Sequence, residues 1–322
     1  MKKIAILDGY TAVRDDLDWS ALKSLGEVSA FDRTPPELVL ERSRGAQIIL
    51  TNKVVLGRSH FEQLPELKYI GILATGCNNI DLAAAREFGI DVSNIPRYGT
   101  DSVAQEIFAH ILNIANAVET HSEAVRGGAW TASPDICFCL TRQTELAGKT
   151  LGLVGYGAIG KKTAQIASAF SMKVLAHTPR LEIGGSDGTA LYAPLDEIFS
   201  KSDIVALCCP LTPETANIIN AENIRKMKDG AWIVNTGRGG LVDERALAEA
   251  LKSGKIGAAG VDVLSAEPPK ADNPLLSAPN CHITPHNAWT TREARARLVK
   301  IACENVASWL EGSGKNIVNA KK

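Results

Sequence analysis

Short runs of apolar, mostly β-branched residues alternate with segments of helical periodicity from one end of the chain to the other. The runs that we predict to be strands are Lys3–Leu7, Ala46–Leu50, Tyr69–Leu73, Thr150–Val154, Lys173–Ala176, Ile204–Leu207, Ala231–Asn235, Ala258–Asp262 and His282–Thr284. Such alternation is typical of βαβ units, in which helices cover both faces of a parallel sheet. The sequence therefore predicts an α/β protein.

The length of the chain favours two domains, because 322 residues is about twice the usual size of one domain. A long helix is predicted from near Asp101 past His121, and another from Arg292 to Leu310. We place one domain at residues 1–99 together with 289–322, and the other at residues 100–288. The chain then crosses twice between the domains, an arrangement compatible with hinged closure over a small ligand.

Composition argues against several classes of partner. The formal net charge is -1 without a long run of one sign, so we expect no binding to nucleic acid or to a membrane. No apolar stretch could span a bilayer, and the run after Met1 is too short for a signal peptide, which predicts a cytoplasmic protein. The seven cysteines include no C-x-x-C pair, so we predict buried reduced thiols and no metal site.

A glycine triad, Gly155-x-Gly157-x-x-Gly160, follows the predicted strand Thr150–Val154 and opens a predicted helix, Lys161–Phe170. A triad alone occurs often by chance, but in this context it indicates a dinucleotide-binding turn. Gly155 permits the tight turn, Gly157 lets the backbone approach a pyrophosphate, and Gly160 lets the helix pack close to the strand. The helix amino end then faces the negative charge. The alternative is a glycine-rich turn without a ligand.

The next predicted strand is followed by Thr178, where the usual fingerprint has an acidic residue that holds the ribose hydroxyls. A carboxylate there would repel a 2′-phosphate, whereas the hydroxyl of Thr178 and the guanidinium of Arg180 offer it hydrogen bonds. We therefore expect NADP or NAD as cofactor, with NADPH used at least as well as NADH. In the alternative interpretation Arg180 is a solvated loop residue and discrimination is weak.

Three later predicted strands lead to Arg238, Glu267 and His286. The carboxyl ends of strands in such sheets converge on the ligand. The planar fork of Arg238 suits the adjacent carboxylate and carbonyl of a 2-oxo acid. His286 is the best donor, by residue type, of the proton that an oxyanion needs after hydride transfer, while Glu267 would fix its tautomer. Taken singly, each residue also has an ordinary structural explanation, such as a surface arginine or a hydrogen-bonded histidine.

Taken together, the motifs resemble those of one known family. They are Gly155-x-Gly157-x-x-Gly160, Asn235-Thr236-Gly237-Arg238-Gly239, Gly260-Val261-Asp262-Val263, Glu267-Pro268 and Pro285-His286-x-Ala288. In this order, across essentially the whole chain, they resemble the D-isomer-specific 2-hydroxyacid dehydrogenases. The resemblance implies a Rossmann cofactor domain, a flavodoxin-like substrate domain and a homodimer built on the cofactor domains.

The resemblance also implies roles for individual residues. The catalytic residues would be Arg238, Glu267 and His286, supported by Asp262. The residues that bind substrate would be Ala74, Thr75, Gly76, Arg238 and His286. The residues that contact the cofactor would be Val103, Gly155, Tyr156, Gly157, Ala158, Ile159, Gly160, Cys208, Pro210, Thr236 and Asp262.

Within the family, residues 74–81, 98–105 and 130–137 look most like those of glycerate dehydrogenases, also called hydroxypyruvate reductases. Gly99 stands where many members carry asparagine and Gln105 where many carry glutamate, which leaves the substrate preference open. We expect reduction of hydroxypyruvate or glyoxylate to the D-hydroxy acid. The alternatives are a reductase of broad 2-oxo-acid specificity and a non-catalytic NAD(P)-sensing protein that binds peptides.

Overall fold

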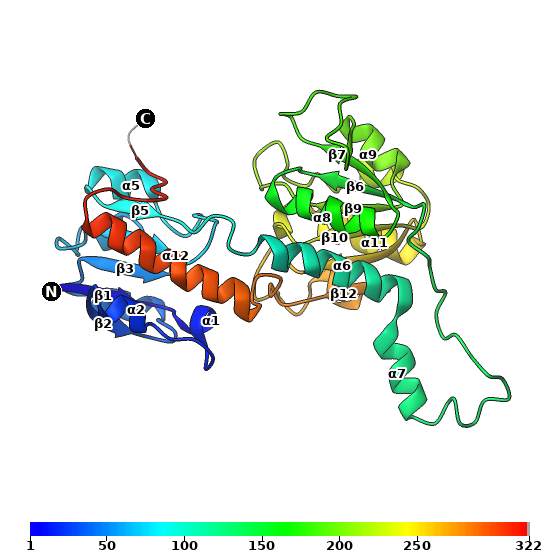
Figure 1. The fold of residues 1–322 in the computed structure, drawn as a ribbon, viewed down its shortest axis with the longest axis horizontal. Helices are drawn as coiled ribbons and strands as arrows, with labels where there is room; N and C mark the ends of the chain where they lie inside the picture. The colour runs from blue at the N-terminus through cyan, green and yellow to red at the C-terminus, as the bar shows by residue number, and fades with distance from the viewer. Residues whose placement is uncertain (321–322) are drawn as a thin grey trace. The chain divides into compact units, whose positions relative to one another are not determined.

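The computed structural model describes residues 1–320, which fold into two compact units (Figure 1). Unit 1 comprises Met1–Gly99 and the chain from Trp289 onward, and unit 2 comprises Thr100–Ala288. Each unit contains one parallel sheet with hydrophobic cores on its two faces. The α/β class predicted from the sequence is confirmed.

Unit 1 is built on a five-stranded parallel sheet with the order β2-β1-β3-β4-β5. Its strands are β1 (Lys2–Ile6), β2 (Gly26–Ala30), β3 (Ile48–Thr51), β4 (Tyr69–Ile72) and β5 (Asp91–Ser93). This order is the flavodoxin-like one. The strands β3 and β4 are buried at every position, because cores cover both of their faces.

The helices of unit 1 are α1 (Tyr10–Val13), α2 (Ser20–Lys23), α3 (Val39–Ser43), α4 (Arg58–Phe61), α5 (Leu82–Glu87) and α12 (Arg292–Leu310). The helix α12 has the bounds expected from the sequence and packs Ala294, Leu298 and Val306 into one core with β1 and β4. Its buried Arg295 donates to both carboxylate oxygens of Asp16, at 2.7 and 2.6 Å. That ion pair joins the last helix to the first segment of the chain.

Unit 2 is built on a seven-stranded parallel sheet with the order β12-β11-β10-β9-β6-β7-β8. Its strands are β6 (Thr150–Val154), β7 (Lys173–His177), β8 (Leu191–Tyr192), β9 (Ile204–Leu207), β10 (Ala231–Asn235), β11 (Ile256–Val261) and β12 (Cys281–Ile283). Counted from β6, the first six strands follow the Rossmann order, and β12 extends that sheet. The order reverses between β6 and β9, so a ligand site is expected at their carboxyl ends.

The helices of unit 2 are α6 (Thr100–Asn116), α7 (Val118–Arg126), α8 (Ala158–Ala169), α9 (Leu195–Lys201), α10 (Ala221–Lys226) and α11 (Glu244–Ser253). The helices α6 and α8 pack together in one core, while α9, α10 and α11 contribute to the other. No helix among residues 1–320 is long and apolar enough to cross a membrane. Within the same residues no group of three or more His, Cys, Asp or Glu side chains is placed to hold a metal ion.

The structure corrects the predicted helix from Asp101 past His121. Ala117 adopts a left-handed conformation, with φ 45° and ψ 48°, and this divides the segment into α6 and α7. A left-handed residue cannot continue a right-handed helix, yet an alanine gives no warning of one in the sequence. The strands β2, β5 and β8 were also not predicted, because they are short or carry few apolar residues.

The segment 118–143, which we call the arm, extends away from the rest of unit 2 (Figure 1). The helix α7 has no buried residue. The arm carries two of the seven free cysteines, Cys137 and Cys139, and both are exposed, whereas the other five are half-buried. The prediction that the cysteines are buried is therefore wrong, because the arm has no core of its own in which to bury them.

Candidate active site

The glycine loop joins β6 to α8 as the sequence predicted. Gly155 has φ +101°, and a Cβ at this position would lie 2.5 Å from the backbone of Cys208 and Cys209. A Cβ at Gly160 would lie 2.4 Å from the carbonyl oxygen of Gly155. Both positions therefore require glycine for close backbone packing. Gly157 is exposed, and a Cβ there would meet no atom within 4 Å.

The loop fits the pyrophosphate of a dinucleotide. The open space at Gly157 leaves room for a ligand against the backbone, and the first turn of α8, which starts at Ala158 and Ile159, has no side-chain cap. The amides of that turn lack partners within the helix, and the helix dipole favours an anion in front of them. Tyr156 differs from the other loop residues, because its side chain is buried and its hydroxyl donates to Asp187 at 2.9 Å. The side chain of Tyr156 therefore does not face a ligand, and only its backbone could contact one.

The residues that follow β7 and β9 flank this loop. Thr178 is half-buried, while Arg180 is exposed and makes no hydrogen bond or ion pair with the described part of the chain. Cys208 hydrogen-bonds through its amide to Val154 at 2.8 Å, and burial raises the pKa of its thiol to about 12. Pro210 is exposed. The thiol of Cys208 is therefore neutral, and Arg180 offers donors that have no acceptor among residues 1–320.

The loop after β10 presents Arg238. The buried Asn235 donates to the carbonyl of Arg238 at 2.9 Å and accepts from the amide of Gly237 at 3.0 Å, which fixes the turn that includes Thr236. A Cβ at Gly239 would lie 1.9 Å from the backbone of Leu264, so the loop packs directly on the segment after β11. The guanidinium of Arg238 is half-buried and makes one hydrogen bond, to its neighbouring carbonyl at 2.7 Å. Its remaining N–H groups are available to a planar acceptor.

His286 and Glu267 form a hydrogen-bonded pair. The distance from Nδ1 of His286 to Oε2 of Glu267 is 2.6 Å, and the other carboxylate oxygen accepts from the amide of Leu264 at 3.1 Å. Because the carboxylate is an acceptor, the proton on this side of the ring lies on Nδ1. The Nε2 atom of His286 has no partner among residues 1–320 and the side chain is 24% exposed. The pair therefore leaves one imidazole nitrogen open to a ligand.

Asp262 holds the backbone that presents His286. Its carboxylate is 1% exposed and accepts from the amides of Asn287 and Ala288 at 2.8 and 3.0 Å, while its carbonyl accepts from the amide of His286 at 2.8 Å. Three hydrogen bonds to one residue hold His286 at φ +51°, a left-handed conformation that costs energy in any residue but glycine. Asp262 thus fixes the loop and does not itself open to the surface.

The candidate acid–base residues lie together at one edge of the unit 2 sheet. The strands β10, β11 and β12 are neighbours, so the loops that carry Arg238, Glu267 and His286 leave the same edge. Val103 lies buried in the first turn of α6. Two nearby residues were not singled out from the sequence, Glu106 and His110 of α6. Their only signal is a polar residue on the apolar face of a helix, which by itself does not indicate function.

The predicted carboxylate-binding residues Ala74, Thr75 and Gly76 follow β4 in unit 1. The hydroxyl of Thr75 donates to the carbonyl of Ile95 at 2.7 Å, and its carbonyl accepts from the side chain of Asn94 at 2.8 Å. The amides of Thr75 and Gly76 have no acceptor among the described residues. Backbone amides without partners are suited to an anion.

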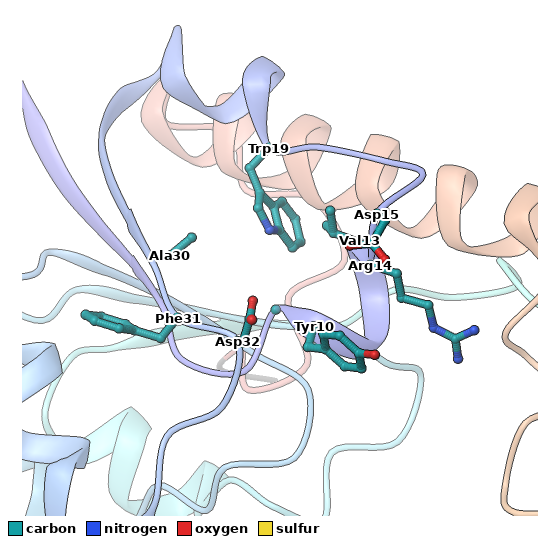
Figure 2. Close-up of a pocket in the computed structure, with 9 residues that line it drawn as sticks. Tyr10, Val13, Arg14, Asp15, Trp19, Ala30, Phe31 and Asp32 are labelled. Carbon is teal, nitrogen blue, oxygen red and sulfur yellow. The ribbon is translucent and has the colours of Figure 1, made fainter.

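Unit 1 also contains a cavity of about 150 Å³ beside α1. In Figure 2, Trp19 projects into it, whereas Arg14 and Phe31 point away from it. None of its lining residues is among the predicted site residues. The cavity and the candidate active site therefore have no residue in common.

Comparison with known proteins identifies the family. The family model described as D-isomer specific 2-hydroxyacid dehydrogenase, NAD binding domain, matches residues 108–288. A hydroxypyruvate reductase of Blautia hydrogenotrophica is 48% identical over 320 residues, which cover 98% of this chain and 99% of that protein. A glycerate dehydrogenase of Methylorubrum extorquens is 40% identical over 325 residues, with 99% of both chains covered.

Among solved structures, an acyclic imino acid reductase in complex with NADPH and D-arginine is similar over 98% of this chain and 99% of its own, with a TM-score of 0.85 and 29% identity. The chain belongs to the D-isomer-specific 2-hydroxyacid dehydrogenase family. It is an oxidoreductase with a nicotinamide dinucleotide as cofactor, and the resemblance predicted from its motifs is confirmed.

The close approach at Gly155 gives a test of the cofactor site. We expect Gly155→Ala to raise the Kd for the reduced dinucleotide by at least about ten-fold, because the new methyl group forces the turn away from Cys208 and adds left-handed strain. Fluorescence titration measures this Kd. Gly148→Ala is the matched control, since Gly148 also has positive φ but a methyl group there meets no atom within 4 Å. An equal Kd for the dinucleotide in the two variants would show that the close packing of Gly155 on Cys208 is not needed for cofactor binding.

Proposed function

We propose that the chain reduces hydroxypyruvate or glyoxylate to the corresponding D-2-hydroxy acid. The observation that carries the proposal is the hydrogen bond from Nδ1 of His286 to Glu267, which leaves Nε2 without a partner among the described residues. The names of the two curated relatives, which align over nearly their whole length, support this substrate class.

In this proposal His286 is the proton donor. A reduced nicotinamide bound at the glycine loop would supply a hydride to the carbonyl carbon, which would leave the electron pair of the carbonyl double bond on oxygen. His286 then gives the proton on Nε2 to that oxygen, which completes the hydroxyl group. Glu267, at 2.6 Å from Nδ1, accepts a hydrogen bond from that nitrogen and holds the ring in position.

Arg238 and the loop at Thr75 would hold the substrate. The free N–H groups of Arg238 match the carboxylate and carbonyl oxygens that lie side by side in a 2-oxo acid. The amides of Thr75 and Gly76, which have no acceptor among residues 1–320, offer further donors for the carboxylate. Both sets of donors contact only the carboxylate and carbonyl groups that all 2-oxo acids share. Specificity for hydroxypyruvate must therefore come from contacts with the rest of the substrate.

His286→Gln tests the proposal. We expect turnover of hydroxypyruvate to fall at least about 100-fold, because the variant lacks the general acid. The Kd for the cofactor should change little, because His286 makes no contact with the glycine loop in the proposal. Steady-state kinetics and fluorescence titration measure the two quantities, and His60→Gln in α4 should behave as wild type.

Two results would contradict the proposal. An unchanged rate in His286→Gln would remove this residue as the proton donor. A wild-type enzyme that used pyruvate and phenylpyruvate as efficiently as hydroxypyruvate and glyoxylate would be a reductase of broad specificity instead.

We further propose that NADPH is used at least as well as NADH. The half-buried hydroxyl of Thr178 and the exposed guanidinium of Arg180, which has no partner among residues 1–320, follow β7, where a carboxylate would repel a 2′-phosphate. The structural relative with NADPH bound supports such a use of the fold, although the family model is named for NAD.

Arg180→Ala tests this preference. We expect kcat/KM with NADPH to fall by about ten-fold, because an exposed charge-assisted hydrogen bond to phosphate is lost, while kcat/KM with NADH stays nearly constant. Arg225→Ala, which removes another exposed arginine of unit 2, should change neither value. A wild-type enzyme with a strong preference for NADH would contradict the proposal.

We also propose that the arm packs against a second copy of the chain. The helix α7 is amphipathic yet buries none of its residues. Five large apolar residues of the arm are exposed, namely Val118, Val125, Trp130, Ile136 and Leu140. Apolar surface of this kind on an extension without a core favours a protein partner, and the family resemblance implies a homodimer built on the cofactor domains.

Ile136→Glu tests the homodimer. Ile136 is 89% exposed, so the substitution should leave the fold intact while placing a charge in the proposed interface. Sedimentation equilibrium should show a dimer for wild type and a monomer for the variant. Leu276→Glu replaces an exposed leucine outside the arm and should remain dimeric. A monomeric wild type, or a dimeric Ile136→Glu, would contradict the proposal.

A further inference from the structure

A buried histidine, His110, lies behind the candidate active site. It projects from α6 toward β11 and is 4% exposed. A Cβ at Gly260 would lie 2.6 Å from its Cβ and Cγ and 2.8 Å from its Nδ1. Only a glycine at this point of β11 leaves room for the imidazole. The ring is thus fixed between helix and sheet, and the proposed proton transfer does not use it.

The hydrogen bonds around His110 have a defined direction. The hydroxyl of Thr284 donates to Oδ1 of Asp262 at 2.7 Å, and a hydroxyl group has one proton to give. The contact between Nε2 of His110 and the same hydroxyl oxygen, at 3.2 Å, must therefore have His110 as donor. His110 carries its proton on Nε2, and a chain of donors runs from His110 through Thr284 to Asp262.

The surroundings favour the neutral form of this histidine. Burial lowers the pKa of His110, with a smaller contribution in the same direction from His282 of β12, while Asp262 opposes it. Glu106, one turn earlier on α6, has its Oε1 3.8 Å from Nε2 of His110. Burial raises the pKa of Glu106, and the nearby carboxylate of Asp262 raises it further. A neutral imidazole that donates from Nε2 satisfies this site without adding a buried charge.

We propose that His110 is a positioning residue for the reaction, acting through Thr284 on Asp262. Asp262 binds the amides of Asn287 and Ala288 and keeps His286 in its left-handed conformation. The donor from Thr284 is a third hydrogen bond to the same carboxylate, and His110 orients that donor. The inference rests on the proposed role of His286, since it concerns how the loop of this residue is held.

The test compares His110→Leu with His110→Gln. Leucine fills the space but removes the donor, whereas the amide nitrogen of glutamine can take the place of Nε2. We expect His110→Leu to lower kcat for hydroxypyruvate by about ten-fold with little change in the KM for the cofactor, and His110→Gln to recover most of this loss. If His110 only fills space, His110→Gln should be no more active than His110→Leu.

A double-mutant cycle with Thr284→Val separates a relay from two independent defects. Because both residues act on Asp262 through one chain, the double variant should be no slower than either single variant. Losses that multiply would overturn the inference, as would equal rates for His110→Leu and His110→Gln.

A spectroscopic measurement separates failure of this inference from failure of the proposed function. Nitrogen NMR of isotope-labelled histidine should show His110 as the neutral tautomer with the proton on Nε2, and Thr284→Val should shift its signal. The opposite tautomer would overturn the relay even in an active enzyme. A correct tautomer in a protein that turns over no 2-oxo acid would instead contradict the proposed function and, with it, the role of His110 in catalysis.

Discussion

The parallel pairing of the unit 2 strands is the constraint on which the site depends. Parallel strands end at the same edge of a sheet, so the loops after β6, β9, β10, β11 and β12 leave from one side. Parallel pairing also requires a crossover between neighbours and cores on both faces, which explains why the central strands β6, β9, β10 and β11 are buried at nearly every position. The glycine positions follow from the same packing. Gly155 lies against the segment after β9, Gly239 against the segment after β11, and Gly260 against α6. At each point the absence of a Cβ lets two backbones, or a backbone and a ring, come close enough to fix a loop.

Two histidines show how the fold gives the same type of side chain two different roles. His286 has its Nδ1 on a carboxylate and its Nε2 open, in a side chain that is partly exposed. His110 donates from Nε2 to a hydroxyl group and is enclosed between α6 and β11, where burial lowers its pKa. An open nitrogen with a carboxylate behind the ring suits proton transfer, whereas an enclosed neutral ring suits orientation. Asp262 connects them, because it accepts from the Thr284 hydroxyl on one side and holds the His286 loop on the other.

The parts of the fold that could be predicted from the sequence are those with a strong local signal. Buried runs such as Ile204–Leu207 and Ala231–Asn235 have the bounds that the pattern predicted, and so does the helix Arg292–Leu310. The strands Gly26–Ala30 and Asp91–Ser93 carry polar residues and become strands only through pairing with β1 and β4, which are distant in sequence. Ala117 is left-handed although nothing in its identity requires it. In the site, the motif residues could be named from the sequence, but His110 could not. From the sequence, a histidine between Ile107 and Ile111 is interpreted as an ordinary core residue. Its contact with Thr284, which is distant in sequence, is known only from the fold.

The residues with proposed roles in binding and catalysis are distributed over the two units of the chain. The candidate acid–base residues, their supporting carboxylate and the glycine loop all lie within Thr100–Ala288. Their mutual geometry is set by one sheet and by hydrogen bonds inside that unit, such as those of Asp262 and Asn235. Residues 74–76 belong to unit 1, so the residues proposed to bind the substrate carboxylate and those proposed for proton transfer lie in different parts of the chain.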